Sequence, residues 1–348
     1  MNLTDPPPLD IEDRAQLLAY LRANERIDAD EEPQSTVLAG GVSNRVVLLR
    51  RANGEAWVLK QALEKLRVAV DWFSSPQRIH SEALGLRWLA ELAPPGASTP
   101  LVFEDFENHI LAMEAVPLPH ENWKTLLLAG TIVADHIGQF AQILATVHRR
   151  ASERTETLAK VFDDASFFES LRLEPYYAFS ATRVPEAAEF LQSLIVATRA
   201  RRFTLVHADF SPKNVLIHNG RLILLDHEVV HWGDPAFDVG FALTHLLSKA
   251  HHLPMHRAAF VAGARGFWSA YSRGLGGPLW QADLEQFCVR HTLACLLARV
   301  AGRSPLEYLD ETERARQRAT VLRLMAHEPQ SVAELTDKFI QGIQTCPS

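Results

Sequence analysis

The alternation of apolar and polar residues gives the chain two parts of different character. From residue 36 to residue 116, apolar and β-branched residues come in short runs of the kind that strands require. Turn residues separate these runs at Gly40-Gly41, at Asn53-Gly54 and at Glu107-Asn108. Because each tight turn reverses the chain, we expect an antiparallel sheet of five strands in this part.

Two amphipathic helices accompany the strand pattern. The first is expected before the sheet, with Asp10 as its cap. The second is predicted to begin near Pro76 and carries Ile79, Ala83 and Leu86 on one face, so this face is expected to cover the sheet.

After Val116 the apolar residues follow helical spacing, and Pro117 and Pro119 mark the change. We therefore expect an α+β, bilobal fold with a small antiparallel-sheet N-lobe and a larger, mainly helical C-lobe. The expected parts are an accessory helix in residues 1–35, an N-lobe in 36–116 and a C-lobe in 117–348. Helical periodicity covers residues 131–150, 185–201, 238–250, 257–273, 281–301, 311–326 and 331–344.

Between the predicted helices, one stretch has the pattern of a loop, a strand, a tight turn and a strand. Asn219-Gly220 separates two apolar runs and favours a type I′ turn, because both central residues of that turn need positive φ. The hairpin would bring Asn214, before its first strand, close to Asp226, after its second. Asp209 lies in the same loop as Asn214. Two carboxylates and an amide oxygen suit a hard cation such as Mg²⁺.

The composition is that of a folded globular protein with 47% hydrophobic and 22% charged residues. Lys and Arg number 35 against 42 Asp and Glu, which gives a formal net charge of −7. This balance disfavours nucleic acid as a partner, because binding a phosphate backbone needs a basic surface.

The cysteines and the apolar runs bear on where the protein works. Cys288, Cys295 and Cys346 form no C-x-x-C pair and are odd in number, so a reducing cytoplasm is expected. The chain opens on an acidic, proline-rich segment that does not resemble a signal peptide. The longest apolar run, residues 126–134, is too short for a membrane span, and no membrane partner is expected. A homodimer stays open, because helix faces that pack within a lobe resemble faces that pack between subunits.

The first turn of the sheet is a candidate phosphate loop. Gly40 and Gly41, followed by Ser43 and Asn44, let backbone N–H groups approach an anion closely. A Gly-Gly turn is also an ordinary hairpin sequence, and the full G-x-G-x-x-G pattern is absent.

A lysine and a glutamate in the N-terminal part are candidates for an ion pair. Lys60 follows the apolar residues of the third strand, which aim it inward, and Glu82 lies beside the apolar face of the second helix. Solvated surface charges are the alternative interpretation of both residues.

The order of these features resembles a known family. The glycine turn, lysine, glutamate and connector are followed by H-A-D-F-S-P-K-N from His207 to Asn214. D-H-E from Asp226 to Glu228 comes next, and then G-D-P-A-F-D, which ends at Asp238. This order is similar to the aminoglycoside phosphotransferase and choline kinase superfamily, the small-molecule branch of the protein-kinase-like fold. Within that branch, V-L-K-Q-A-L and the residues after it are most similar to methylthioribose kinase.

The resemblance implies roles for the catalytic and metal residues. Asp209 would orient the acceptor hydroxyl and accept its proton, while Asn214 and Asp226 would hold Mg²⁺. Glu228 follows two residues later on a strand-like segment, so it is expected on the side of Asp226, facing a second metal or the substrate. Phosphoryl transfer needs alignment and neutralised charge more than covalent help, and these groups supply both.

The resemblance also implies a nucleotide site for ATP. Lys60 would contact the α and β phosphates and would be held there by Glu82, while the glycine turn would cover the phosphates. The connector Met113, Glu114 and Val116 would offer backbone groups to adenine.

Two residues call for comment against the family pattern. Ala208 replaces the glycine often found between the histidine and the aspartate of the motif. Asp238 is implied to brace the catalytic loop through hydrogen bonds, although it could equally cap a helix, and one aspartate can do both.

The histidines of this region have a second interpretation. His207 is expected to be structural, bonded to backbone beside a buried aspartate. His218, His227 and His231 could in principle form a transition-metal hydrolase site with the two aspartates, but no H-x-x-x-H pair supports this.

Three residues are candidates for contact with the acceptor. Trp232 lies beside the metal motif, although core packing is its ordinary alternative. Arg299 and Arg303 are similar in kind to the arginines that methylthioribose kinase uses near its sugar, and surface arginines are the alternative.

Together these features predict an ATP-dependent, Mg²⁺-requiring kinase that transfers the γ-phosphate to a hydroxyl of a sugar or sugar-like metabolite. An aminoglycoside phosphotransferase is one alternative, and the net charge of −7 permits the acidic pocket that it needs. A kinase-like nucleotide-binding protein without catalysis is another. The presence of Lys60, Asp209, Asn214 and Asp226 disfavours the inactive protein.

Overall fold

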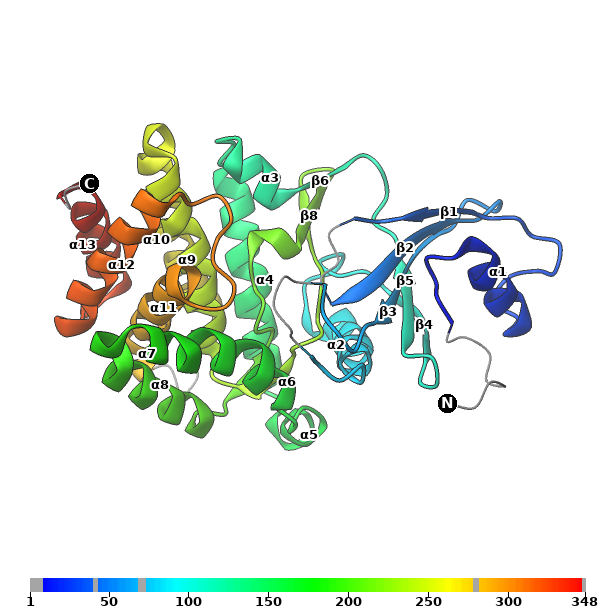
Figure 1. Cartoon of the computed structure of the whole chain (residues 1–348), viewed down its shortest axis with the longest axis horizontal. Coiled ribbons are helices and arrows are strands. Elements are labelled where there is room, and N and C mark those ends of the chain that lie inside the picture. Colours follow the sequence, from blue (N-terminus) through cyan, green and yellow to red (C-terminus); the bar gives the residue numbers. More distant parts are fainter. Residues whose placement is uncertain (1–8, 40–42, 68–72, 278–281, 346–348) are drawn as a thin grey trace. The chain divides into compact units, whose positions relative to one another are not determined.

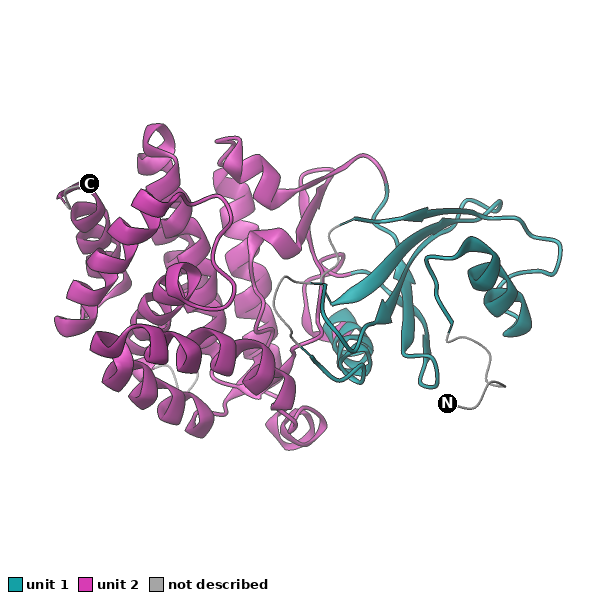
Figure 2. Cartoon of the chain, in the orientation of Figure 1, with its two compact units in different colours: residues 1–90, 99–117 teal, residues 91–98, 118–348 magenta. Residues whose placement is uncertain are grey.

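The computed structural model folds into two compact units (Figures 1 and 2). It describes residues 9–39, 43–67, 73–277 and 282–345. Unit 1 comprises residues 1–90 and 99–117, and unit 2 comprises residues 91–98 and 118–348. The units therefore divide next to the expected boundary at residue 116, but the short segment 91–98 belongs to unit 2, which the linear pattern did not indicate.

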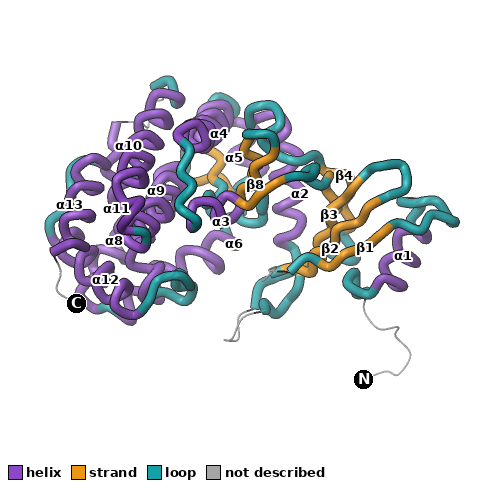
Figure 3. The backbone as a smooth tube through the Cα atoms, turned by 90° about the horizontal axis from the view of Figure 1, so that it is seen from above, coloured by secondary structure: helices purple, strands orange, loops and turns teal. Residues whose placement is uncertain are grey.

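Unit 1 contains the predicted five-stranded antiparallel sheet (Figure 3). Its strand order is β1-β2-β3-β5-β4, which places the lysine strand β3 at the centre. The strands are β1 (Gln34–Val37), β2 (Asn44–Arg50), β3 (Ala56–Ala62), β4 (Leu101–Asp105) and β5 (Ile110–Glu114).

Alternate residues of β3 enter two different cores of unit 1, because side chains of a strand alternate between faces. Leu59 packs in one core together with Leu17 and Leu21 of α1 (Arg14–Ala23). Val58 packs against the other core, which holds Ile79 of α2 (Arg78–Leu92). The helix expected as an accessory element is thus part of the core of unit 1.

The predicted cap of α1 was wrong by three residues. Asp13 caps the helix, since its side chain accepts hydrogen bonds from the backbone N–H groups of Ala15 and Gln16. Asp10 instead accepts a hydrogen bond from the N–H of Glu12 in the preceding turn. Both aspartates match the cap pattern in sequence, and the turn between them decides which one is used.

Unit 2 is mainly helical and is built around α9 (Pro235–His252), in which every residue from Pro235 to His251 is buried (Figure 1). α9 packs against α10 and α11. It begins before the predicted start because Asp234 caps it and Pro235 occupies its first position. The other α-helices of the unit are α3 (Trp123–Leu128), α4 (Ala134–Ser152), α5 (Thr155–Val161), α6 (Ser166–Phe168), α7 (Phe179–Arg183), α8 (Ala188–Ala200), α10 (Arg257–Gly274), α11 (Leu284–Ala301), α12 (Glu311–Ala326) and α13 (Val332–Thr345).

Unit 2 also contains short strands and one π-helix. The strands are β6 (His120–Asn122), β7 (Thr204–Val206), β8 (Val215–His218), β9 (Arg221–Leu224) and β10 (His231–Gly233). The π-helix η1 covers Glu169–Ala178. In the part of the chain that the structure describes, no helix has the length and hydropathy of a membrane span.

Candidate active site

The predicted hairpin is present in unit 2. β8 pairs with β9 so that His218 faces Arg221, and Asn219 and Gly220 between them have φ of 50° and 73°. Just beyond the ladder, the N–H of Leu225 donates to the carbonyl of Asn214 at 2.9 Å. The hairpin therefore brings the loop before β8 next to the segment after β9, as its sequence predicted.

Asn214 is joined directly to Asp209. Its side-chain Nδ2 donates to Oδ2 of Asp209 at 2.6 Å and to the main-chain carbonyl of Asp209 at 3.0 Å. Because the amide nitrogen of Asn214 donates to Asp209, its amide oxygen is the atom that can coordinate a cation.

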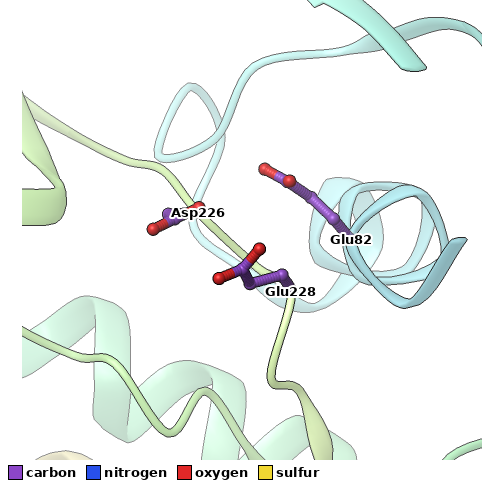
Figure 4. Close-up of side chains that lie close together, drawn as sticks. All are labelled: Glu82, Asp226 and Glu228. Carbon is purple, nitrogen blue, oxygen red and sulfur yellow. The ribbon is translucent and has the colours of Figure 1, made fainter. Parts of the chain in front are cut away.

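Asp226 and Glu228 lie together on the segment after β9 (Figure 4). An oxygen of one carboxylate lies within 4.8 Å of an oxygen of the other, and Glu228 is buried. The expected reason for this placement was wrong, because residues 225–230 do not form a strand. Asp226 instead adopts a left-handed conformation with φ of 68°, so a turn and not strand alternation places the two carboxylates.

These three side chains fit a magnesium ion. An amide oxygen and two carboxylates are hard oxygen donors, and Mg²⁺ prefers such donors with water and phosphate completing its shell. Asn214, Asp226 and Glu228 are therefore the residues of unit 2 that would hold the metal.

Asp238 braces the catalytic loop, as the resemblance implied. Its two carboxylate oxygens accept hydrogen bonds of 2.7 Å from the backbone N–H groups of His207 and Ala208. Asp234 and not Asp238 caps α9, which settles the alternative. On its other side Asp238 Oδ2 lies 3.3 Å from Nε2 of His148, whose Nδ1 lies 2.8 Å from the hydroxyl of Tyr271. A buried chain of polar groups thus ties the loop to α4 and α10.

Ala208 occupies a conformation that explains why glycine is often found at this position. Its φ is 62°, in the left-handed region where a Cβ costs an L-residue roughly 1–2 kcal/mol. Both polar groups of its backbone are used, since its N–H donates to Asp238 and its carbonyl accepts from Nε of Arg172 at 2.7 Å. These hydrogen bonds hold the loop in the strained conformation.

Arg172 is a site residue that the sequence did not indicate. It projects from the π-helix η1 and is buried. Its Nη2 lies 3.1 Å from Oδ1 of Asp209, and its Nη1 donates to the carbonyl of Leu171 at 2.8 Å. Pro175 lies within the same helix and breaks the helical pattern of this segment in sequence, so the segment did not appear among the predicted helices.

The charge of Asp209 follows from these neighbours. Burial alone would raise the pKa of its carboxyl, but the guanidinium of Arg172 and then the ammonium of Lys213 outweigh burial and hold the pKa below its usual value. Burial by itself would lower the pKa of Arg172, and the carboxylate of Asp209 more than restores it. Asp209 is therefore ionised and is oriented by two side chains, Arg172 and Asn214.

His207 is structural, as expected. Its Nδ1 accepts a hydrogen bond from the N–H of Asp209 at 3.2 Å, and its Nε2 lies 3.1 Å from Nδ1 of His227. Burial lowers the pKa of its imidazole, so the ring is neutral near pH 7. His218 and His231 contact the carbonyls of Pro119 and Val229, respectively, and neither arrangement supports a transition-metal site.

In unit 1, Lys60 and Glu82 form the expected ion pair. Nζ of Lys60 lies 2.6 Å from Oε1 of Glu82, and the glutamate side chain is fully buried. Arg78, also buried, donates to the carbonyls of Ser43 and Leu63 and so anchors the end of the candidate phosphate loop to α2. A lysine held in this way can present its charge to a phosphate.

The remaining residues of the predicted nucleotide site are only partly described. Gly40 and Gly41 lie outside the described residues. Ser43 is joined to its neighbour, since Nδ2 of Asn44 lies 3.2 Å from its hydroxyl. In the connector, the N–H of Glu114 donates to Pro100 and the N–H of Ala115 donates to Ala56.

The connector residues Met113 and Val116 are both buried in unit 1. Because neighbouring segments already engage the two N–H groups between them, a contact of the connector with adenine stays a prediction.

Comparisons with known proteins agree with this geometry. The model of the phosphotransferase enzyme family matches residues 35–277, which include the Lys60–Glu82 pair, the catalytic loop and the acidic pair. The chain belongs to the phosphotransferase enzyme family.

The relatives found among known proteins include methylthioribose kinases. A methylthioribose kinase from Yersinia enterocolitica is 26% identical over 243 residues, which are 62% of this chain and 60% of that kinase. The chain thus spans less than two thirds of the length of that relative.

Solved structures share the fold of this chain. A choline/ethanolamine kinase family protein from Mesorhizobium loti has a TM-score of 0.51 at 14% identity, over 96% of this chain and 99% of that one. A choline kinase from Cryptosporidium parvum has a TM-score of 0.52 at 12% identity, over 95% of each chain. The phosphotransferase is therefore α+β with a protein-kinase-like fold, as predicted.

Two of the acceptor candidates, Trp232 and Arg299, lie in different surroundings. Trp232 is only 2% exposed, and its indole N–H donates to the carbonyl of Arg202 at 3.1 Å, so it is a core residue of unit 2. Arg299 is buried as well, but its guanidinium lies over the ring of Tyr176, which Arg172 also contacts. Arg299 is therefore the candidate connected to the catalytic loop.

Proposed function

We propose that this phosphotransferase transfers the γ-phosphate of ATP to a hydroxyl group of a sugar or sugar-like small molecule. The observation that carries the proposal is the state of Asp209, a largely buried carboxylate kept ionised by Arg172 and held by Asn214. The methylthioribose kinase among its relatives supports a sugar as the acceptor.

The residues present can perform each part of this reaction. Asp209 would accept the proton of the acceptor hydroxyl, because its carboxylate is deprotonated and cannot rotate freely between Arg172 and Asn214. Lys60 would bind phosphate oxygens of ATP, with Glu82 fixing its position. Magnesium, held by Asn214, Asp226 and Glu228, would neutralise phosphate charge. The protein's contribution is thus orientation and a preorganised charge distribution.

The proposal also includes the cell compartment and the kind of partner. A small-molecule acceptor in the cytoplasm, without nucleic acid or a membrane as partner, is supported by the net charge of −7 and by the lack of a C-x-x-C motif.

An acceptor panel tests the function directly. The purified full chain is incubated with ATP, MgCl₂ and one acceptor at a time, namely 5-methylthioribose, ribose, choline or kanamycin, and ADP release and product mass are measured. We expect phosphorylation of a sugar, and a rate about 10²- to 10⁴-fold lower with the Asp209→Asn variant. Phosphorylation of kanamycin or choline alone would contradict the sugar assignment, and ATP binding without any transfer would favour an inactive nucleotide-binding protein.

A further inference from the structure

A group of buried polar side chains lies beyond the catalytic loop in unit 2. It consists of His245 and Lys249 of α9, Arg299 of α11 and Tyr308 of the following loop, which we call the basic cluster. His245, Lys249 and Arg299 are each less than 9% exposed, and the hydroxyl of Tyr308 is buried. None of these residues except Arg299 was indicated by the sequence.

A continuous row of contacts joins Asp209 to the basic cluster. Arg172, which pairs with Asp209, has its guanidinium carbon 5.8 Å from the ring centre of Tyr176. Arg299 also lies over the ring of Tyr176, with its guanidinium carbon 4.8 Å from the same ring centre. Tyr176 thus connects the guanidinium at the catalytic carboxylate to the guanidinium of the basic cluster.

The row continues along α9. Arg299 lies 5.1 Å from the ring centre of Phe241, and the rings of Phe241 and His245 are 5.0 Å apart. Lys249 follows one turn later, with Nζ 3.3 Å from the carbonyl of His245 and 5.3 Å from the ring centre of Tyr308. The cluster is therefore a contiguous group.

The geometry of α9 gives the cluster a fixed separation from the loop. Asp238, which braces the loop, His245 and Lys249 are spaced seven and eleven residues apart and so share one face of the helix. At 1.5 Å per residue, His245 lies about 10 Å and Lys249 about 16 Å along the helix from Asp238.

Several polar atoms of the cluster lack a hydrogen-bond partner among the described residues. They are Nε2 of His245, Nε of Arg299, the hydroxyl of Tyr308 and the hydroxyl of the adjacent Ser248. All four can donate a hydrogen bond, and buried polar groups of folded proteins are almost always paired. Four such donors in one place indicate a ligand that accepts hydrogen bonds.

The charges around the cluster are mainly positive. Burial lowers the pKa of His245 well below its usual value, and the next contributions come from cations, Lys249, Arg299, Lys124 and Lys213. Glu307 is the acidic group that acts on Lys249, and it forms its own ion pair with Lys124. Burial and the cations Lys124 and Arg299 bring the pKa of Lys249 to about 7, so an anion bound beside it would favour the charged form of the lysine.

We propose that the basic cluster binds an anionic group, a carboxylate or phosphate, on the same small molecule whose hydroxyl is phosphorylated. This assignment rests on the proposed phosphotransferase function and specifies its substrate class. It places an acidic sugar derivative ahead of a polycationic aminoglycoside, since like charges repel the latter from this site.

Matched pairs of acceptors test the charge preference. D-ribonate is compared with ribitol, and D-ribose 5-phosphate with D-ribose, by calorimetric binding to the full chain and by ADP release with ATP and MgCl₂. We expect the acidic member of at least one pair to bind and to react about 10- to 100-fold better, the range expected for charge-assisted hydrogen bonds.

Variants locate the preference within the protein. Lys249→Met and Arg299→Met should each remove most of the preference for the acidic member, whereas Arg303→Met should keep it. Arg303 is a suitable control because it is partly exposed and pairs with Glu174 outside the cluster. Thermal unfolding of each variant shows whether it folds. If Arg299→Met does not fold, Lys249→Met still tests the site.

The outcomes separate this assignment from the proposed function. Equal or better binding of the neutral members, or a full preference retained in folded Lys249→Met and Arg299→Met, overturns the anion site even if sugars are phosphorylated. Preferential binding of the acidic members that both variants abolish supports the site even if no ADP forms, in which case the proposed function fails alone.

Discussion

The two units each contain a largely buried ion pair to which the proposed reaction assigns a role, and the two pairs differ in construction. In unit 1, Lys60 and Glu82 join the central strand of the sheet to α2 at 2.6 Å. In unit 2, Arg172 of the π-helix joins Asp209 of the catalytic loop at 3.1 Å. The first pair was predictable and the second was not.

The difference lies in what each cation does besides pairing. Lys60 is a point charge whose position Glu82 fixes, which suits a residue that must reach a phosphate. Arg172 uses three separate nitrogens, for the carbonyls of Leu171 and Ala208 and for the carboxylate of Asp209. An arginine with its donors distributed in this way fixes the conformation of the loop and also keeps Asp209 ionised.

Removing the acid of each pair should separate the two roles most strongly. Asp209→Asn should lower kcat about 10²- to 10⁴-fold, the usual contribution of a general base, with ATP affinity kept. Glu82→Gln should chiefly weaken ATP binding, because Lys60 loses the group that positions it. Steady-state kinetics and ATP calorimetry on both variants check this, and a Glu82→Gln variant with normal ATP affinity would break the comparison.

Exchanging the cations should give a smaller and asymmetric effect. Arg172→Lys should lower kcat about 10-fold or more, since one ammonium cannot reach both the carbonyl of Ala208 and the carboxylate of Asp209. Lys60→Arg should raise the KM for ATP and affect kcat less. Kinetics of the two variants with saturating acceptor decide the matter. Arg172→Lys with wild-type kcat would show that only its charge is needed.

Lys249 is a third buried basic residue and extends the comparison. Among the described residues it forms no ion pair with an acidic side chain. Burial, followed by the charge of Lys124, lowers its pKa from 10.5 to about 7. Between these pH values the unfolded chain binds a proton that the folded chain does not, so this group makes the protein more stable as pH rises from 7 to 10.

The variant Lys249→Met should therefore be more stable than wild type near pH 7, by on the order of 3 kcal/mol, and the gain should shrink toward pH 10. Urea unfolding at a series of pH values measures it. Lys338→Met serves as the control, because that lysine is well exposed and pairs with Glu334 on the surface. A gain that does not depend on pH would show that Lys249 is not neutral in the folded protein.

The smallest expected effect concerns the loop that Arg172 holds. Ala208→Gly removes the left-handed strain of about 1–2 kcal/mol but adds unfolded-state entropy and loses a buried methyl group. The net change in unfolding free energy should stay within about 1 kcal/mol. Ala242→Gly in the buried, regular α9 should cost about 1 kcal/mol or more. Thermal melts of both variants check this, and a larger loss from Ala208→Gly would mean that the methyl group supports the loop.

The sequence predicted those site features that are encoded within short segments. Asn219-Gly220 specifies its turn by local backbone preference, and the turn then fixes the neighbourhood of Asn214 and Asp226. The five-stranded sheet followed from turns and β-branched runs in the same way. Local patterns of this kind need no knowledge of distant packing.

The sequence did not predict features that depend on rare backbone conformations or on packing. Arg172 lies in a π-helix that contains Pro175, and the helical pattern does not recognise such a segment. Glu228 lies near Asp226 as predicted, but the left-handed backbone of Asp226 causes this and strand alternation does not. Trp232 and Arg299 look alike as candidates in sequence, and only tertiary contacts distinguish the core residue from the one near Tyr176.

The arrangement of α9 has a consequence for how such enzymes can diversify. Asp238 near its start ties the catalytic loop to His148 and Tyr271, while His245 and Lys249 lie two and three turns later on the same face. Exchanges at the later positions leave the hydrogen bonds of Asp238 untouched. With the proposed role of the basic cluster, a lineage could acquire a new acceptor by mutation toward the end of the helix while its descendants inherit the hydrogen bonds at its beginning unchanged.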